Sequence, residues 1–154
     1  MTGFTIPQGL LIEEDASGDR LYLEQQKLDH YFPQFSFAQS RTSGYLSVVG
    51  FLRTNAGRNY SLKIVLPSDY PHGIPAIFPQ GWTAKCPHIY PPGNLCIMKS
   101  EQWRPFYTIA FVVAKSGIWL NKYDVYQRTH TWPGNEQFHD FVALRQVKKW
   151  WDSL

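Results

Sequence analysis

Cysteine is scarce in this 154-residue chain, and so is charge of either sign. The two cysteines, Cys86 and Cys96, do not form a Cys-x-x-Cys pair, so the sequence lacks the usual ligand pattern of a zinc site. Charged residues make up only 18% of the chain, and its net charge of +3 comes with no basic run longer than Lys148-Lys149. Such a balance does not favour nucleic acid as a partner.

Long apolar runs are missing as well. The longest one, residues 109–114, has six residues, whereas a membrane-spanning helix needs roughly 20. The N-terminal residues lack the charged and apolar regions of a signal peptide. We therefore expect a cytoplasmic protein with no membrane partner, whose cysteines stay reduced as free thiols. The chain has no Gly-rich nucleotide-binding loop, so we expect it to need neither ATP nor another cofactor.

The chain does contain enough apolar material for a folded core. Apolar residues reach 44% and aromatic residues 16%, which indicates a globular protein. The length is that of one ordinary domain, and no repeat, low-complexity segment or linker divides it. We therefore expect a single domain over residues 1–154.

Hydrophobic periodicity predicts an α+β domain with an antiparallel sheet. A first helix is expected over residues 20–31, capped by residues 17–19. Its expected apolar face consists of Leu21, Leu28 and Phe32. Runs rich in β-branched or aromatic residues then predict the strands of a meander, at residues 35–39, 45–53 and 60–66, with a fourth short strand at 76–78.

Two more helices are expected after a loop region with seven prolines between residues 67 and 92. A long loop of this kind in a compact domain is usually functional or disordered, and its aromatic content favours an ordered one. Thr108 is placed to cap a crossover helix that runs to about residue 127. A last, C-terminal helix is expected over residues 135–151, where apolar side chains recur at intervals of three and four.

The segment around the second cysteine is the most informative part of the chain. Cys96 follows a turn that contains Gly93, stands between Leu95 and Ile97, and precedes Trp103-Arg-Pro105 by seven residues. A lone thiol in this position is typical of a positioned nucleophile, because a thiolate attacks acyl groups well and its thioester stays reactive toward amines. From the segment alone, the alternative is a buried cysteine that packs as a small apolar side chain.

The order of these landmarks resembles the ubiquitin-conjugating enzyme family. The matching landmarks are Tyr70-Pro71, Pro75, His88, Gly93, Leu95-Cys96, Trp103-Arg-Pro105 and Thr108-Ile109. The resemblance covers roughly residues 20–154 and departs from the family at one important place. The eukaryotic family has His-Pro-Asn, whose Asn stabilises an oxyanion, where this chain has His88-Ile89-Tyr90. Bacterial relatives in antiphage and ubiquitin-like conjugation operons also lack that Asn, so the chain resembles a bacterial ubiquitin-conjugating-enzyme-like protein.

The resemblance implies a cysteine acyltransferase that carries its acyl group on Cys96 as a thioester. The donor would be a protein C-terminus activated by a separate activating enzyme. Either a ubiquitin-like modifier or a cyclic-oligonucleotide synthase would supply this C-terminus, the latter in antiphage defence. The acceptor would be an amine such as a protein lysine.

The resemblance also implies roles for residues close to Cys96. A histidine at the position of His88 mainly braces the active-site loop, with acid–base work as the alternative. Asn94 is a candidate oxyanion donor in place of the missing Asn, or else a turn residue after Gly93. Trp103 is expected to pack under the cysteine loop or to contact the substrate.

In this fold the loop after the crossover helix returns beside the active cysteine. His130 is therefore a candidate base for the attacking lysine. Trp132 is a candidate wall of the site. Asn135 would orient the amine, or alternatively cap the last helix.

Two other hypotheses remain open from the sequence. One is a catalytically inactive binding module of the same fold, which the missing Asn favours a little. The other is a redox or zinc-binding domain that uses Cys86 and Cys96, with His88 as a further zinc ligand. A papain-like hydrolase is disfavoured by the strand order and by the absence of a helix N-terminus at Cys96.

Overall fold

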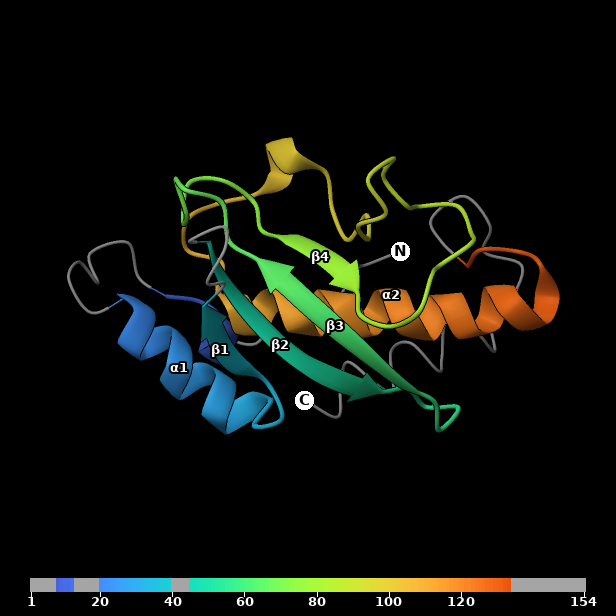
Figure 1. Cartoon of the computed structure of the whole chain (residues 1–154), viewed down its shortest axis with the longest axis horizontal. Coiled ribbons are helices and arrows are strands. Elements are labelled where there is room, and N and C mark those ends of the chain that lie inside the picture. The colour runs from blue at the N-terminus through green and yellow to red at the C-terminus, as the bar shows by residue number, and fades with distance from the viewer. Residues whose placement is uncertain (1–7, 13–19, 40–44, 134–154) are drawn as a thin grey trace.

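The elements of the chain follow one another in the predicted order (Figure 1). The computed structural model describes residues 8–12, 20–39 and 45–133. The helices are α1 (Arg20–Tyr31) and α2 (Ile109–Thr129), with short 3-10 helices at Gln8–Leu10 and Ser100–Gln102. The strands are β1 (Ser36–Gln39), β2 (Leu46–Arg53), β3 (Asn59–Val65) and β4 (Ala76–Pro79).

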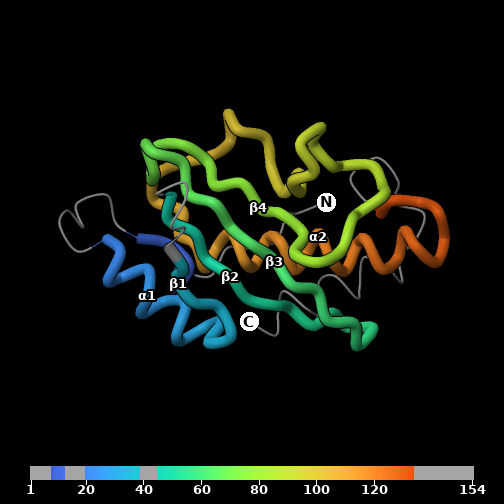
Figure 2. Tube along the Cα trace, viewed as in Figure 1, coloured from blue at the N-terminus to red at the C-terminus, as the bar shows by residue number. Residues whose placement is uncertain are grey.

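The four strands form one antiparallel sheet in the order β1-β2-β3-β4. The predicted α+β class and the meander are thereby confirmed. The predicted helix cap at residues 17–19 and the predicted last helix at 135–151 lie outside the described residues. Figure 2 shows the long segment between β4 and α2 running along the β4 side of the sheet.

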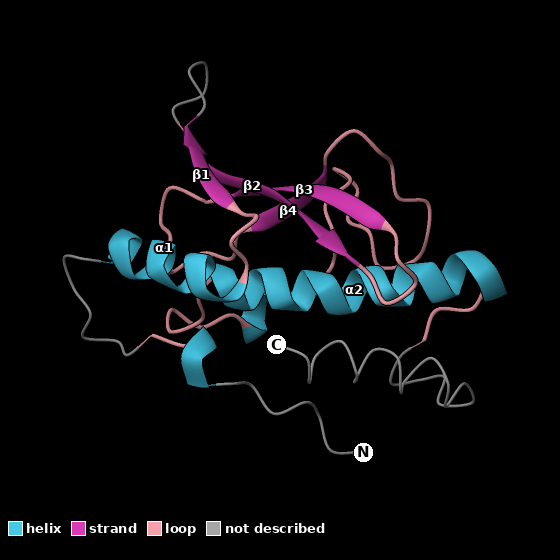
Figure 3. Cartoon of the chain, turned by 90° about the horizontal axis from the view of Figure 1, so that it is seen from below, coloured by secondary structure: helices cyan, strands magenta, loops and turns pink. Residues whose placement is uncertain are grey.

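Strand register explains why the sheet has a buried face. Side chains alternate along β3, so Leu62 and Ile64 are fully buried, whereas Ser61 is exposed and Lys63 is partly exposed. Ile64 pairs with Val48 on β2 and with Ile77 on β4, and all three are at most 1% exposed. Both α1 and α2 lie on the same side of the sheet (Figure 3).

Helix α2 is a core helix rather than an amphipathic one. Its side chains from Ile109 to Ala114 and from Ser116 to Asn121 are buried, as is typical of a helix that is apolar on most sides. Thr108 caps it as predicted, because its hydroxyl oxygen accepts a hydrogen bond from the Phe111 N–H at 3.0 Å. No described helix of the chain is both long and apolar enough to cross a membrane.

The predicted apolar face of α1 is wrong in its first turn. Leu28 and Phe32 are buried as expected, but Leu21 is 49% exposed and Glu24 is fully buried instead. The reason is that polar contacts, not apolar packing, hold this turn. The Arg20 guanidinium donates to the carbonyl oxygens of Pro105 and Tyr107, each at 2.7 Å.

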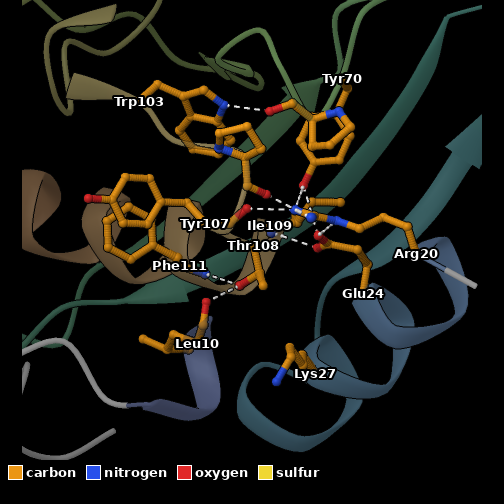
Figure 4. A network of polar contacts seen from close by, with 12 residues as sticks. Leu10, Arg20, Glu24, Lys27, Tyr70, Trp103, Tyr107, Thr108, Ile109 and Phe111 are labelled. Carbon is orange, nitrogen blue, oxygen red and sulfur yellow. Dashed lines mark hydrogen bonds and ion pairs between the residues drawn. The ribbon is translucent and has the colours of Figure 1, made fainter. Parts of the chain in front are cut away.

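Glu24 is the centre of a buried polar network at the N-terminus of α2 (Figure 4). Its Oε1 accepts hydrogen bonds from Arg20 Nε at 3.0 Å and from the Tyr70 hydroxyl at 2.8 Å. Its Oε2 accepts from the Ile109 N–H at 2.7 Å. A carboxylate is favourable there because the first N–H groups of a helix are unpaired and carry partial positive charge.

The same region holds the two loops that flank the cysteine segment. Trp103 Nε1 donates to the Pro71 carbonyl oxygen at 2.8 Å, and its ring packs against Tyr70 and Tyr107. The Tyr-Pro and Trp-x-Pro motifs are therefore packed against each other beside the start of α2. Burial raises the pKa of Glu24, and the hydrogen bonds from Ile109, Tyr70 and Arg20 only partly oppose that increase.

Candidate active site

Cys96 lies on an extended segment that is attached to the edge of the sheet. The N–H of Leu95, the residue before it, donates to the Ile77 carbonyl oxygen of β4 at 2.8 Å. Leu95 is buried in the core, whereas Cys96 is a free, half-buried thiol. Neighbouring side chains of extended backbone point to opposite sides, so the anchoring of Leu95 turns Cys96 away from the core.

A tight turn returns the chain toward Cys96. The Gly93 N–H donates to the Tyr90 carbonyl oxygen at 2.8 Å across Pro91-Pro92. Gly93 has a φ of +100°, a conformation that side-chain-bearing residues rarely adopt. Before and after the turn, Ile89 and Leu95 form an antiparallel bridge. The cysteine segment is therefore one arm of a short hairpin.

The backbone of His88 holds the nucleophile's segment in place. Its carbonyl oxygen accepts one hydrogen bond from the Cys96 N–H at 3.0 Å and another from Trp119 Nε1 of α2 at 3.1 Å. His88 has a left-handed φ of 65°. The predicted bracing of the loop therefore has a geometric basis, although it comes from the His88 carbonyl group and not from its ring. Sequence reasoning missed Trp119, to which it assigned no role.

The loop after α2 reaches the other side of His88. The ring of Trp132 lies 5.1 Å from the His88 ring and 5.1 Å from the Trp119 ring, centroid to centroid. Trp132 is buried, and its contact with His88 places it next to the residue that binds the Cys96 N–H. The contact between Trp132 and His88, which are 44 positions apart, brings the loop after α2 next to the hairpin that carries Cys96.

His130 and Asn135 are less directly connected to the thiol. His130 ends α2 with a left-handed φ of 61°, and its N–H donates to the Tyr126 carbonyl oxygen at 2.7 Å. Its exposed ring packs edge-on against Tyr126. Within the described part of the chain, no hydrogen bond or ring contact joins His130 to Cys96. Asn135 lies outside the described residues.

A groove runs beside the hairpin, between the turn and the start of β4. It has a volume of about 340 Å³. Its lining is mainly apolar and includes Pro75, Ala76, Pro92, Leu95, Ile97 and Met98. Asn94 also lines this groove. Trp103 is buried and donates its indole N–H to the Pro71 carbonyl oxygen. The roles of Asn94 and Trp103 in catalysis or substrate binding remain predictions.

Within the described part of the chain, Tyr90 has a side chain that interacts with the thiol itself. The pKa of its phenol is raised to about 12, first by a hydrogen bond with Cys96, then by burial and by the charges of Cys96 and Glu101. Sequence reasoning noticed that Tyr90 stands where the family has an Asn, but it assigned the tyrosine no role.

The other thiol, that of Cys86, has no such position on the hairpin. Burial raises the pKa of the Cys86 thiol to about 11. Among the residues that the structure describes, no group of three or more His, Cys, Asp or Glu could hold a metal ion.

Residues 24–140 match the model of a protein family described as Type II CBASS E2 protein. The chain belongs to this family. The membership confirms the resemblance to bacterial ubiquitin-conjugating-enzyme-like proteins, and it gives this CBASS E2 a conjugating-enzyme-like role. Such a role implies conjugation partners, for example an E1-like enzyme and a modifier.

Two solved structures from Plasmodium are similar to this CBASS E2. The Plasmodium vivax ubiquitin conjugating enzyme E2 is 23% identical, with a TM-score of 0.48 over 64% of this chain and 97% of that one. The ubiquitin conjugating enzyme E2 of Plasmodium falciparum is 17% identical, with a TM-score of 0.44 over 62% and 92%. No curated protein matches the chain.

The hydrogen bond from the Trp119 indole to the His88 carbonyl oxygen can be tested by substitution in this CBASS E2. Trp119→Phe keeps a ring but removes the indole N–H, so the His88 carbonyl oxygen loses one of its two donors. We expect a loss of about 1 kcal/mol in unfolding free energy and a changed rate of Cys96 alkylation by iodoacetamide, measured by peptide mass spectrometry.

Trp82→Phe is the matched control. It also removes an indole N–H from a backbone carbonyl, but that carbonyl belongs to Ser61 on β3 and not to the hairpin. It should leave the alkylation rate of Cys96 unchanged. Equal rates in both variants would show that Trp119 does not hold the cysteine segment.

Proposed function

We propose that Cys96 accepts an activated protein C-terminus as a thioester and then passes it to an amine. The observation that carries this proposal is the position of Cys96: a free, half-buried thiol on a hairpin arm that both β4 and α2 hold in place. The family membership supports the same chemistry. A cysteine that served only as core packing would point inward, as its neighbour Leu95 does.

The proposed reaction has two acyl transfers. In the first, the Cys96 thiolate attacks the thioester carbonyl carbon of the charged activating enzyme. A new C–S bond forms, the old one breaks, and the activating enzyme's thiolate leaves and takes up a proton. In the second, an amine attacks the Cys96 thioester, a C–N bond forms, and Cys96 leaves as the thiolate. The donor is a ubiquitin-like modifier or the C-terminus of a cyclic-oligonucleotide synthase.

The surroundings of the hairpin suit this exchange. The apolar groove beside Leu95 and Ile97 can hold the last residues of the donor, because an extended chain end needs a narrow, mainly apolar channel. The acceptor lysine would approach on the side of Trp132. There His130 and Asn135 are proposed to deprotonate and orient the amine.

The direct test is a charging assay. The protein is mixed with ATP, the E1-like enzyme of a type II CBASS operon, and either the modifier or the synthase of that operon. On a non-reducing gel we expect an adduct of the summed mass that disappears when a thiol reductant is added. A donor shortened at its C-terminus is the matched control and should give no adduct. If a donor that the E1-like enzyme has demonstrably activated forms no adduct, the protein is instead a binding module of this family.

A further inference from the structure

The hairpin places the Tyr90 side chain on the same side as the Cys96 thiol. Ile89 and Leu95 face each other across the bridge, and both pack against the core. Side chains alternate along each arm, so the next residues, Tyr90 and Cys96, point the other way. They form a diagonal pair across the hairpin, a separation that an aromatic side chain can span. The raised pKa of the Tyr90 phenol, whose largest cause is its interaction with Cys96, agrees with this geometry.

The backbone N–H groups of Cys96 and of its two neighbours are already engaged in hydrogen bonds. The Cys96 N–H donates to His88, the Leu95 N–H donates to Ile77, and the Ile97 N–H donates to the Leu95 carbonyl oxygen at 3.2 Å. Acyl transfer by a thiol normally needs a donor that stabilises the negative oxygen of the tetrahedral intermediate. Because these three N–H groups are engaged, we look for the donor among the side chains next to the thiol.

Among the described residues next to the thiol, Tyr90 is suited to that task. Its hydroxyl donates a hydrogen bond to the carbonyl oxygen of Met98, two residues after Cys96, at 3.3 Å, so the phenol extends across the cysteine. Its raised pKa keeps the phenol protonated at neutral pH, and therefore able to donate. Asn94 lines the groove, and its backbone carbonyl oxygen accepts a hydrogen bond from the Tyr90 N–H at 3.0 Å.

We propose that the Tyr90 hydroxyl donates a hydrogen bond to the oxyanion that forms when the Cys96 thioester is attacked. This inference rests on the proposed function of Cys96. As the amine nitrogen bonds to the carbonyl carbon, the π electrons of the C=O bond move to its oxygen. The Tyr90 O–H then donates a hydrogen bond to this oxyanion. Collapse restores the C=O bond, breaks the C–S bond and releases the Cys96 thiolate, while the proton of the amine passes to water. Tyr90 thus performs in this chain the work that the absent Asn performs in the eukaryotic family.

The test measures discharge alone, and it uses a chemical probe in place of the unidentified donor. The full chain carrying Cys86→Ser is acylated on Cys96 with the mercaptoethanesulfonate thioester of N-acetylglycine, then mixed with free lysine. Mass spectrometry follows the loss of the acyl group. Tyr90→Phe, which keeps the ring and removes the hydroxyl, is expected to slow discharge about 100-fold. Tyr90→Asn, which restores a donor of the family's own type, is expected to recover at least a tenth of the original rate.

Two controls separate oxyanion stabilisation from a structural role. Tyr22→Phe removes an exposed phenol on α1 and should leave discharge unchanged. Alkylation of Cys96 at about pH 10, where an ordinary thiol is ionised, should proceed equally in the parent and in Tyr90→Phe. A fall in alkylation that matches the fall in discharge would overturn the inference, because Tyr90 would then act through the loop or the thiol.

The outcomes also distinguish this inference from the proposed function. If the parent discharges rapidly and Tyr90→Phe discharges equally fast, the Tyr90 inference is wrong and the function of Cys96 stands. If the parent discharges no faster than the same thioester on a short cysteine peptide, the proposed function itself fails, and the Tyr90 inference fails with it.

Discussion

Cys96→Ala is expected to abolish every thiol-sensitive adduct between this protein and an activated donor. The reason is that the other thiol is a poor nucleophile: burial raises the pKa of Cys86 to about 11. At pH 7, only on the order of one Cys86 thiol in ten thousand is then ionised, and the thiolate is the attacking form. Cys86→Ala, the matched control, should charge at nearly the wild-type rate.

Cys96→Ser makes this prediction sharper. A serine hydroxyl is a weaker nucleophile than a thiolate, so charging should be much slower. Any adduct that does form would be an oxygen ester, which resists thiol reductants and accumulates because it reacts slowly with amines. Gels run with and without reductant, followed by peptide mass spectrometry, locate the bond. If the adduct persists in Cys96→Ala and is lost in Cys86→Ala, the nucleophile is Cys86 and the proposed site is wrong.

Glu24→Ala is expected to cost about 3–5 kcal/mol of unfolding free energy. Removing one partner of a buried ion pair leaves an uncompensated charge, here that of Arg20. The Tyr70 hydroxyl loses an acceptor, and so does the Ile109 N–H that begins α2. Urea unfolding followed by circular dichroism measures the change.

A conservative variant and a surface control test this explanation. Glu24→Gln keeps the shape, but its amide nitrogen must face either Ile109 or Arg20, both of which donate. A loss of about 1–3 kcal/mol is therefore expected. Asp29→Ala, on the exposed side of the same helix, should change the unfolding free energy very little. A loss from Glu24→Ala no larger than that from Asp29→Ala would contradict the buried network.

The raised pKa of Glu24 also predicts the pH dependence of stability. The folded protein binds this proton more tightly than the unfolded chain does. The contribution of protonated Glu24 to the unfolding free energy is therefore complete below the ordinary pKa of 4.5. It is lost as the pH rises through the higher folded-state value. The unfolding free energy of the wild type, compared with that of Glu24→Gln, should therefore fall as the pH rises through this window. A difference that increases with pH would show that the hydrogen bonds outweigh burial.

The arrangement of elements was predictable because it depends on local patterns. Alternation along β3, the cap at Thr108 and the spacing of apolar residues in α2 are properties of neighbouring residues in the chain. The motifs around Cys96 were equally local, and they indicated both the family and the candidate nucleophile. Each of these signals is contained in a window of about one helix or strand.

Contacts between distant segments could not be predicted in the same way. Helical periodicity placed Leu21 in the core, but the first turn of α1 is held by Arg20 and Glu24, whose partners lie about 85 residues later. The contact between His88 and Trp132 likewise depends on where α2 ends relative to the sheet.

By itself the sequence determined the order of helices and strands, the family, and Cys96 as the candidate thiol. Only the tertiary structure decided what surrounds that thiol. The hairpin register places Tyr90 on the same side as Cys96, and the N–H groups of Cys96 and its two neighbours are engaged in hydrogen bonds. The physical reason is that propensity and periodicity act along the chain, whereas the environment of a side chain is set by register and packing between segments that the sequence holds far apart.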